Sequence, residues 1–375
     1  MPFKNTFNRF LAIDSDSIED PGSDHPGANV DTDQSTPSDL VFEPGNGYRY
    51  VVFISPGTIT FNRGGNVDVL CIAGGASGGT GSTQYNPDPN PPWNPTYFHK
   101  GGGGGGAGGM VELFNEPFPD GQFDVSIGSG GDAVGSTATQ VGNDGSPSYV
   151  QKSSSNSNSF TTITAYGGGR GGGGPASNQL FRGGRNGGSG GGGGQGTSIE
   201  SYDPFGNNTT IEVSSTPSPA PLRSTQPQPQ GNGGGRGAGD SFSSTGSPTQ
   251  YGGGGGGAGA AANLASGGNG RTVWSGDTGI PTDYGTPGPT PGRWFCGGGA
   301  GGLVGSFNPG GAGGGGPTGF SDSFPPLTAP NCPAMPKERA NGGGGAGQQG
   351  GQSYTGSSNS SSHGSNGIVI FRYQI

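Results

Sequence analysis

Glycine occurs in this chain in unbroken runs of up to six residues, and these runs limit what the chain can fold into. Examples lie at 101–106, 171–174, 190–194, 252–257, 297–299, 313–316 and 342–345. The 90 glycines and 33 prolines make up about a third of the 375 residues, which by itself is typical of disordered chains. Apolar, β-prone sequence nevertheless brackets the runs at Tyr48–Ala73 and Ile368–Tyr373, and aromatic residues, which flexible linkers lack, occur between them. We therefore expect an ordered structure.

Backbone hydrogen bonding between the glycine runs is the ordering force that we expect. Hydrophobic residues make up 26% of the chain, too few for a conventional core throughout. In a polyproline-II-type helix the backbone groups point outward, and glycine helices can bond to one another because no Cβ separates them. We predict a bundle of such polyglycine-II helices. A larger residue within a run, such as Ala107, Arg170 or Ala346, would mark a face that reaches solvent or a softer layer.

Strand patterns flank the glycine-rich part of the chain. Alternation places Val67, Val69, Cys71 and Ala73 on one face of a strand, with Leu70 and Ile72 on the other. Further strands are predicted at Tyr50–Ile54, around Ile59 and Phe61, and at Met110–Phe114, Phe123–Ile127, Thr161–Tyr166 and Ile368–Tyr373. The predicted fold is mostly β and irregular. A small β-sandwich base, from 48–166 and 366–375, is closed by the C-terminal strand, and the bundle with its long loops occupies 100–350.

Residues 1–45 form a separate acidic segment before the glycine-rich domain at 46–375. They hold nine carboxylates against two basic residues, and so most of the formal net charge of −9. Their apolar cluster contains Phe3, Phe7, Phe10 and Leu11. One interpretation is a disordered tail. The other is an anchoring arm that becomes ordered when these side chains dock on a partner protein.

Proline-rich and aromatic spacers separate the glycine passages. Prolines stiffen a loop, and exposed aromatic rings supply contact area. The aromatic residues either seal the edges of the bundle or contact a receptor at its tip, and both interpretations stay open. The candidates for receptor contact are Tyr85, Trp93, Tyr97, Phe98, Trp274, Tyr284 and Trp294.

The sequence contains no convincing motif for catalysis or metal binding. Residues 75–79 and 187–191 fit the nucleophile-elbow pattern, but no strand–helix pattern surrounds them. We expect no enzyme and no cofactor. The widely spaced Cys71, Cys296 and Cys332 are predicted to be free thiols rather than a disulfide framework or a zinc site, so no metal is expected.

Charge and targeting signals limit the kinds of partner and the cellular location that we expect. The acidic balance argues against a nucleic-acid partner, although several arginines lie next to glycines. The N-terminus lacks the apolar stretch of a secretory signal, and no window is long enough to span a membrane. We expect synthesis in a cytoplasm.

Five segments, taken in order, resemble a known family. They are VDVLCIAGGASGG (67–79), GGGGGGAGGMVEL (101–113), FDVSIGSGG (123–131), ITAYGGGRGGGG (163–174) and GSNGIVIFRY (364–373). Together they resemble the glycine-rich domain of tail and other virion proteins of bacteriophages of marine bacteria and cyanobacteria. The chain is also similar in principle to the distal adhesins of T-even-like phage tail fibres. The resemblance implies a β base that supports a polyglycine-II bundle.

Three functions follow as hypotheses. The first is a phage virion protein, a tail-fibre or tail-tip component, present as a homo-oligomer or in multiple copies. Residues 1–45 would bind other virion proteins, and the loops would contact a glycan or outer-membrane protein of the host surface. The second is a capsid decoration or head-fibre protein. The third is a cellular adhesin or ice-binding protein, although the strict Gly-x-x repeats with disulfides that favour ice binding are absent from the sequence.

Overall fold

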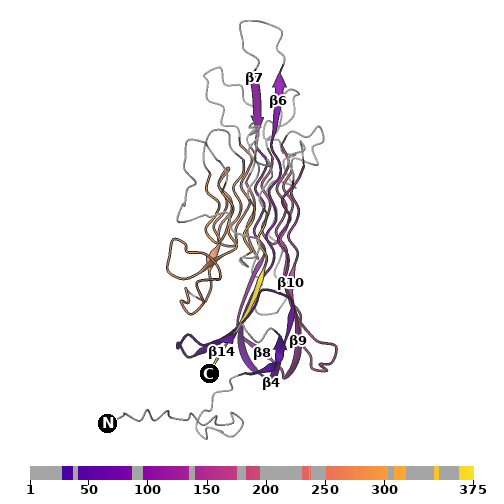
Figure 1. The fold of residues 1–375 in the computed structure, drawn as a ribbon, viewed down its shortest axis with the longest axis vertical. Coiled ribbons are helices and arrows are strands. Elements are labelled where there is room, and N and C mark those ends of the chain that lie inside the picture. The colour runs from indigo at the N-terminus through magenta and orange to yellow at the C-terminus, as the bar shows by residue number, and fades with distance from the viewer. Residues whose placement is uncertain are drawn as a thin grey trace, which may run out of the picture.

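The molecule is elongated, with a β-structured base at one end and a β-hairpin at the other (Figure 1). The structure is a computed structural model that describes residues 28–36, 41–86, 96–134, 140–174, 183–194, 230–235, 237, 251–274, 276–302, 308–317, 342–345 and 363–375. In these ranges the chain forms fourteen β-strands and no helix, and hence no helix that could cross a membrane. The predicted mostly β fold is confirmed.

Two five-stranded antiparallel sheets form the base. The first, called the β14 sheet, has the order β2-β3-β14-β5-β8, and the second, called the β9 sheet, has the order β1-β4-β9-β10-β11. The strands of the β14 sheet are β2 (Val41–Phe42), β3 (Tyr48–Phe53), β14 (Ile368–Gln374), β5 (Gly65–Ile72) and β8 (Met110–Phe118). Those of the β9 sheet are β1 (Asn29–Thr36), β4 (Gly57–Arg63), β9 (Gly121–Ser126), β10 (Ser148–Lys152) and β11 (Ile163–Ala165).

A hydrophobic cluster built around phenylalanine rings joins the two sheets into a sandwich. The Phe118 ring lies 5.1 Å from the Phe61 ring, 5.1 Å from the Phe123 ring and 5.8 Å from the Phe371 ring, measured between centroids. Phe61, Phe123 and Phe371 are fully buried. Aromatic pairs at such distances add to the free energy gained from burial of their apolar area.

The C-terminal strand β14 lies in the middle of its sheet, hydrogen-bonded to β3 on one side and to β5 on the other. Successive side chains of a strand point to opposite faces. Val369 and Phe371 therefore enter the sandwich core, while Ile368 and Ile370 belong to a second hydrophobic cluster on the outer face. Burial on both faces explains the continuous apolar sequence of this strand. The predicted closure of the base by the end of the chain is correct.

The structure contains the predicted strands and several that the patterns did not indicate. Strands β3, β4, β5, β8, β9, β11 and β14 coincide with predicted ones. Strand β10 was not predicted, because its sequence SYVQK has little apolar alternation. Two short pairs also went unpredicted: β6 (Ser82–Asn86) with β7 (Thr96–Lys100), and β12 (Arg271–Thr272) with β13 (Trp294–Phe295).

Strands β1 and β2 lie within residues 1–45, the segment predicted to be an acidic arm. Val30 in β1 is buried in the sandwich core, and Ala28 is 5% exposed there. Since β1 and β2 are edge strands, few of their residues need be apolar. The base therefore includes residues 28–36 and 41–42. Only residues 1–27 are left for an arm, and they lie outside the described residues.

The glycine passage 101–109 runs from the hairpin toward the base, at the centre of other passages. It donates hydrogen bonds to three of them with a period of three residues, at N···O distances of 2.7–3.0 Å. The donor and acceptor pairs are Gly103–Gly172, Gly106–Gly169 and Gly109–Tyr166; Gly104–Gly253 and Ala107–Gly256; and Gly105–Gly345 and Gly108–Gly342. Its carbonyl groups accept hydrogen bonds from three further passages, 73–79, 189–192 and 299–302. Six described passages therefore surround it.

Backbones approach so closely in this region that a Cβ atom would collide with a neighbour. A Cβ on Gly103 would overlap the carbonyl oxygen of Gly192, and one on Gly254 would overlap that of Ser266. Ala107 is fully buried, and its side chain belongs to the second hydrophobic cluster. Arg170 is half-buried, and Ala346 lies outside the described residues.

Candidate functional site

The hairpin end of the molecule contains three of the seven predicted contact residues. Tyr85 of β6 pairs with Tyr97 of β7, and Phe98 pairs with Gln84. Trp93 belongs to the connection 87–95, outside the described residues. Sequence reasoning proposed these residues for one loop, and the structure places the described ones on two paired strands.

Other glycine passages also reach the hairpin end. Gly174 donates a hydrogen bond to the carbonyl of Thr80, which lies just before β6. Gly302 donates to Gly102, just after β7, and Gly252 donates to Gly302. Gly174, Gly252 and Gly302 therefore lie at the hairpin end of the glycine passages. The base, in which Ala28 is buried, lies at the opposite end (Figure 1).

The remaining candidates lie in a strap, residues 271–296, that covers the outer face of the β14 sheet. Pairing of β12 with β13 closes the strap at its two ends. Its side chains Val273, Trp274, Ile280 and Phe295 complete the second hydrophobic cluster, in which the sheet supplies Leu70, Ile72, Ile368 and Ile370. Within the cluster Phe295 is fully buried and Trp274 is 5% exposed. The strap seals this face of the sheet.

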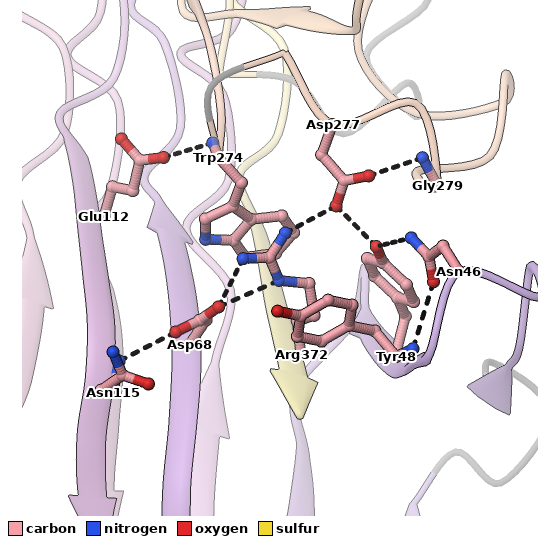
Figure 2. Close-up of polar contacts among 10 residues, drawn as sticks. Asn46, Tyr48, Asp68, Glu112, Asn115, Trp274, Asp277, Gly279 and Arg372 are labelled. Atoms are coloured by element: carbon pink, nitrogen blue, oxygen red, sulfur yellow. Dashed lines mark hydrogen bonds and ion pairs between the residues drawn. The ribbon is translucent and has the colours of Figure 1, made fainter. Parts of the chain in front are cut away.

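Arg372 of β14 joins the strap to two strands of the sheet through a buried polar network (Figure 2). Its Nε and Nη2 donate to Oδ2 of Asp68, the residue opposite it on β5, at 3.0 and 2.5 Å. Its Nη1 donates to Oδ2 of Asp277 in the strap at 2.8 Å. The guanidinium carbon lies 4.3 Å from the Trp274 ring centroid and 4.5 Å from that of Tyr48. The cation is thus paired with two carboxylates and flanked by two aromatic rings.

Asp277 also accepts a 2.5 Å hydrogen bond from the hydroxyl of Tyr50, to which Asn46 donates in turn. Burial opposes ionisation of Asp277, but hydrogen bonds from Tyr50, the Gly279 amide and Arg372 outweigh it and lower the pKa of the carboxyl group. Burial, followed by the hydrogen bond to Asp277, raises the pKa of Tyr50 to about 12. Asp277 is therefore a stable anion that holds the strap on the base.

Trp274 and Cys296 have left-handed backbone conformations, which are uncommon for residues with side chains. Their φ angles are 46° and 58°. Each such residue costs roughly 1–3 kcal/mol and persists where the surroundings determine it. The Trp274 amide donates to Oε1 of Glu112 at 2.5 Å, which fixes one of the two positions. Trp274 lies near the start of the strap, and Cys296 is its last residue.

Trp294 braces an exposed loop of the strap, residues 287–291, which we call the proline loop, and Arg293 holds the segment before it. The Trp294 indole Nε1 donates to the Thr290 carbonyl at 3.1 Å, and a Cβ on Gly288 would collide with the indole ring. Arg293 donates to the carbonyls of Thr282, Tyr284 and Gly285. Tyr284 and Trp294 are half-buried. Trp274, Tyr284 and Trp294 are thus part of the strap's own structure, and Trp274 has little surface to offer a receptor.

Sequence reasoning missed Asp68, Asp277, Arg293 and Arg372. A signal existed for two of them, because Asp68 and Arg372 interrupt otherwise apolar strands, and a charge in a buried strand needs a partner. No local signal identified Asp277 as that partner. Among the described residues, no three side chains of the kinds that bind metals gather at one place.

Comparison with known protein families gives one match. A family model described as a glycine-rich domain matches residues 54–374, which include the strands from β4 to β14 and the described glycine passages. Comparison with curated proteins gives no match.

Proposed function

Since this chain belongs to the glycine-rich domain family, we propose that it is a structural protein of a bacteriophage virion, a tail-fibre or tail-tip component that touches the host cell. The resemblance of its five ordered segments to virion proteins motivates the proposal. The role is one of attachment and display rather than catalysis. The observation that carries it is the polarity of the molecule: Ala28, which follows the acidic residues in the sequence, is buried in the base, and the β6–β7 hairpin lies at the opposite end.

Within this function, the glycine passages are polyglycine-II helices that make a stiff spacer. The period-three hydrogen bonding of passage 101–109 supports this assignment, because a polyproline-II-type helix has three residues per turn. A crystal structure would test it. Backbone angles near φ −75° and ψ +145° are expected in 101–109, and angles typical of β-strands would contradict it.

Residues 1–27 are the anchor in this proposal, and Phe3, Phe7, Phe10 and Leu11 dock on another virion protein. The acidic side chains of the segment add electrostatic complementarity to a basic surface. Particles produced with a chain that lacks 1–27 should lack the protein, while the purified truncated chain stays folded. Normal incorporation of the truncated chain would exclude the anchoring role.

The hairpin end carries host contact, through Tyr85, Trp93, Tyr97 and Phe98, to a surface glycan or an outer-membrane protein. Aromatic faces suit both kinds of partner. Replacement of Trp93 by Ala should reduce adsorption to host cells without a change in melting temperature. The buried Trp274 provides the contrast, because Trp274→Ala should destabilise the protein by about 3–5 kcal/mol. Unchanged adsorption of the Trp93→Ala particles would contradict the assignment.

Quantitative mass spectrometry of purified particles tests the function as a whole. A tail-fibre or tail-tip component should be present in a few copies per particle. Hundreds of copies would instead indicate a capsid decoration protein. Absence of the chain from particles would reject the virion role altogether.

A further inference from the structure

The proline loop is an uncharged surface that the proposed contacts at the two ends of the molecule do not use. All five of its residues, Pro287, Gly288, Pro289, Thr290 and Pro291, are exposed. Trp294 supports the loop through two contacts. Its ring packs against Gly288, and its indole Nε1 donates a hydrogen bond to the Thr290 carbonyl. The loop is therefore held outward from the strap.

The backbone of this loop is also stiff for a reason that lies in its sequence. From Thr286 to Pro291 every residue is either a proline or the residue before one. Proline fixes its own φ, and it restricts the preceding residue to extended conformations. Bridging between Thr286 and Trp294 closes the loop at its root. A stiff loop loses little conformational entropy when it binds, so its exposed apolar rings are suited to a contact.

The position of the strap indicates which neighbour the loop would meet. The strap is fixed to the β14 sheet of the base through Arg372 and the second hydrophobic cluster. In Figure 1 it is the orange segment at the side of the molecule, between the base and the far end of the bundle. In the proposed function the hairpin end faces the host, so the strap lies toward the particle.

We infer that the proline loop is a second docking point on the particle, which inserts its pyrrolidine rings into an aromatic-lined depression of a neighbouring virion protein. The inference rests on the proposed function. Aromatic side chains present large apolar faces against which exposed proline rings can pack. The loop has no charged side chain, so an apolar site fits it better than the basic surface that suits the acidic arm. Arm and loop would then be two linked contacts with one particle.

Thr290 provides a sharp test, because its carbonyl makes the bracing hydrogen bond and its side chain can be changed without loss of that bond. Thr290→Glu keeps the brace and places a charge in the centre of the contact. We expect about tenfold fewer copies on washed particles, equivalent to about 1.4 kcal/mol, with an unchanged melting temperature. Thr290→Ser is the matched control and should be incorporated normally. Incorporation of Thr290→Glu at the wild-type level would overturn the inference.

Photo-cross-linking in intact particles identifies the surface that is contacted. A benzophenone amino acid at position 290 should form an adduct with one virion protein, at a peptide that contains aromatic residues. The same probe at the exposed Thr282 of the strap should form none. No adduct from position 290, equal adducts from both positions, or an adduct remote from aromatic residues would each reject the docking point. If the wild-type chain is absent from particles, the proposed function fails and the inference with it. Presence of the chain without the adduct rejects the inference alone.

Discussion

At the scale of single residues, buried charges decide how the strap is attached. Arg372, Asp68 and Asp277 have side chains that are 10%, 11% and 10% exposed. Removal of one partner from such a group leaves another charge buried without compensation, which is more costly than loss of an exposed ion pair. Asp277 is the only one of the three that belongs to the strap. Its ionisation should therefore control how strongly the strap is held.

Asp277→Asn should destabilise the protein at pH 7 by about 1–3 kcal/mol, the cost of an unmade hydrogen bond to a charged group. The folded-state pKa of Asp277 lies below its unfolded value, so its contribution is complete above about pH 4 and is lost as pH falls through the folded pKa. Urea unfolding of both proteins from pH 7 to pH 2 should show the difference shrink in acid. Asp283→Asn, at an exposed position of the same strap, is the control. A difference that stays constant down to pH 2 would contradict the role of this carboxylate.

The two described cysteines make a second prediction for single residues. Cys71 and Cys296 are free and fully buried; burial raises the pKa of the Cys71 thiol to about 12 and raises the pKa of the Cys296 thiol as well. Since the thiolate is the reactive form, neither should react with a disulfide reagent at pH 8 in the native protein. The measurement uses a Cys332→Ser variant, and both thiols should react in denaturant. Rapid reaction before unfolding would show that the base opens readily.

At the scale of elements, close approach of glycine backbones replaces side-chain packing. Ordering each residue costs roughly 1–2 kcal/mol of backbone entropy, and a single backbone hydrogen bond contributes about 0.5–1.5 kcal/mol net. One isolated passage could not remain ordered on that basis. Passage 101–109 uses both its amides and its carbonyls, toward six neighbours, so the order of each passage depends on the others.

Gly103→Val and Gly254→Val should each destabilise the protein by a few kcal/mol, because a Cβ at either position meets a backbone carbonyl that cannot rotate away. Ala107→Gly, within the same passage as Gly103, is the control. It removes a side chain without adding a collision, and should cost about 1 kcal/mol. Thermal unfolding measures all three. Melting of both valine variants at the wild-type temperature would mean that the passages are not packed as described.

At the scale of the whole molecule, the base is completed by the last strand of the chain. Strand β14 lies between β3 and β5 and contributes to both hydrophobic clusters. Without it the β14 sheet would be divided, and Asp68 and Asp277 would lose the cation that pairs with them. The N-terminal segment is different, since the described base begins at Ala28.

Deletion of 368–375 should therefore abolish cooperative unfolding, whereas deletion of 1–27 should leave the melting temperature within a few degrees of wild type. A deletion that extends to residue 45 should fall between them, because it removes the edge strands β1 and β2. Circular dichroism and calorimetry on the three truncated chains would distinguish these cases. A cooperative transition after loss of 368–375 would show that β14 is dispensable.

Local sequence patterns determined much of the fold. Alternation in residues 67–73 and 123–127 identified strands, because period-two burial leaves a direct trace in a sequence. The glycine runs predicted passages that have no room for side chains. The structure agrees at Gly103, where a Cβ atom would collide with the Gly192 carbonyl. The apolar sequence of 368–373 indicated a strand that closes the base.

Tertiary structure alone decided which distant segments meet. Asp277 contacts Arg372 across 95 positions of sequence, and no local pattern distinguishes it from the exposed Asp283. Trp274 and Trp294 could not be told apart from receptor-contact residues in the sequence, because an aromatic residue among prolines is equally suited to a core and to a surface. Burial of Trp274 depends on the outer face of the β14 sheet, which exists only after β3, β5 and β14 have come together from both ends of the chain.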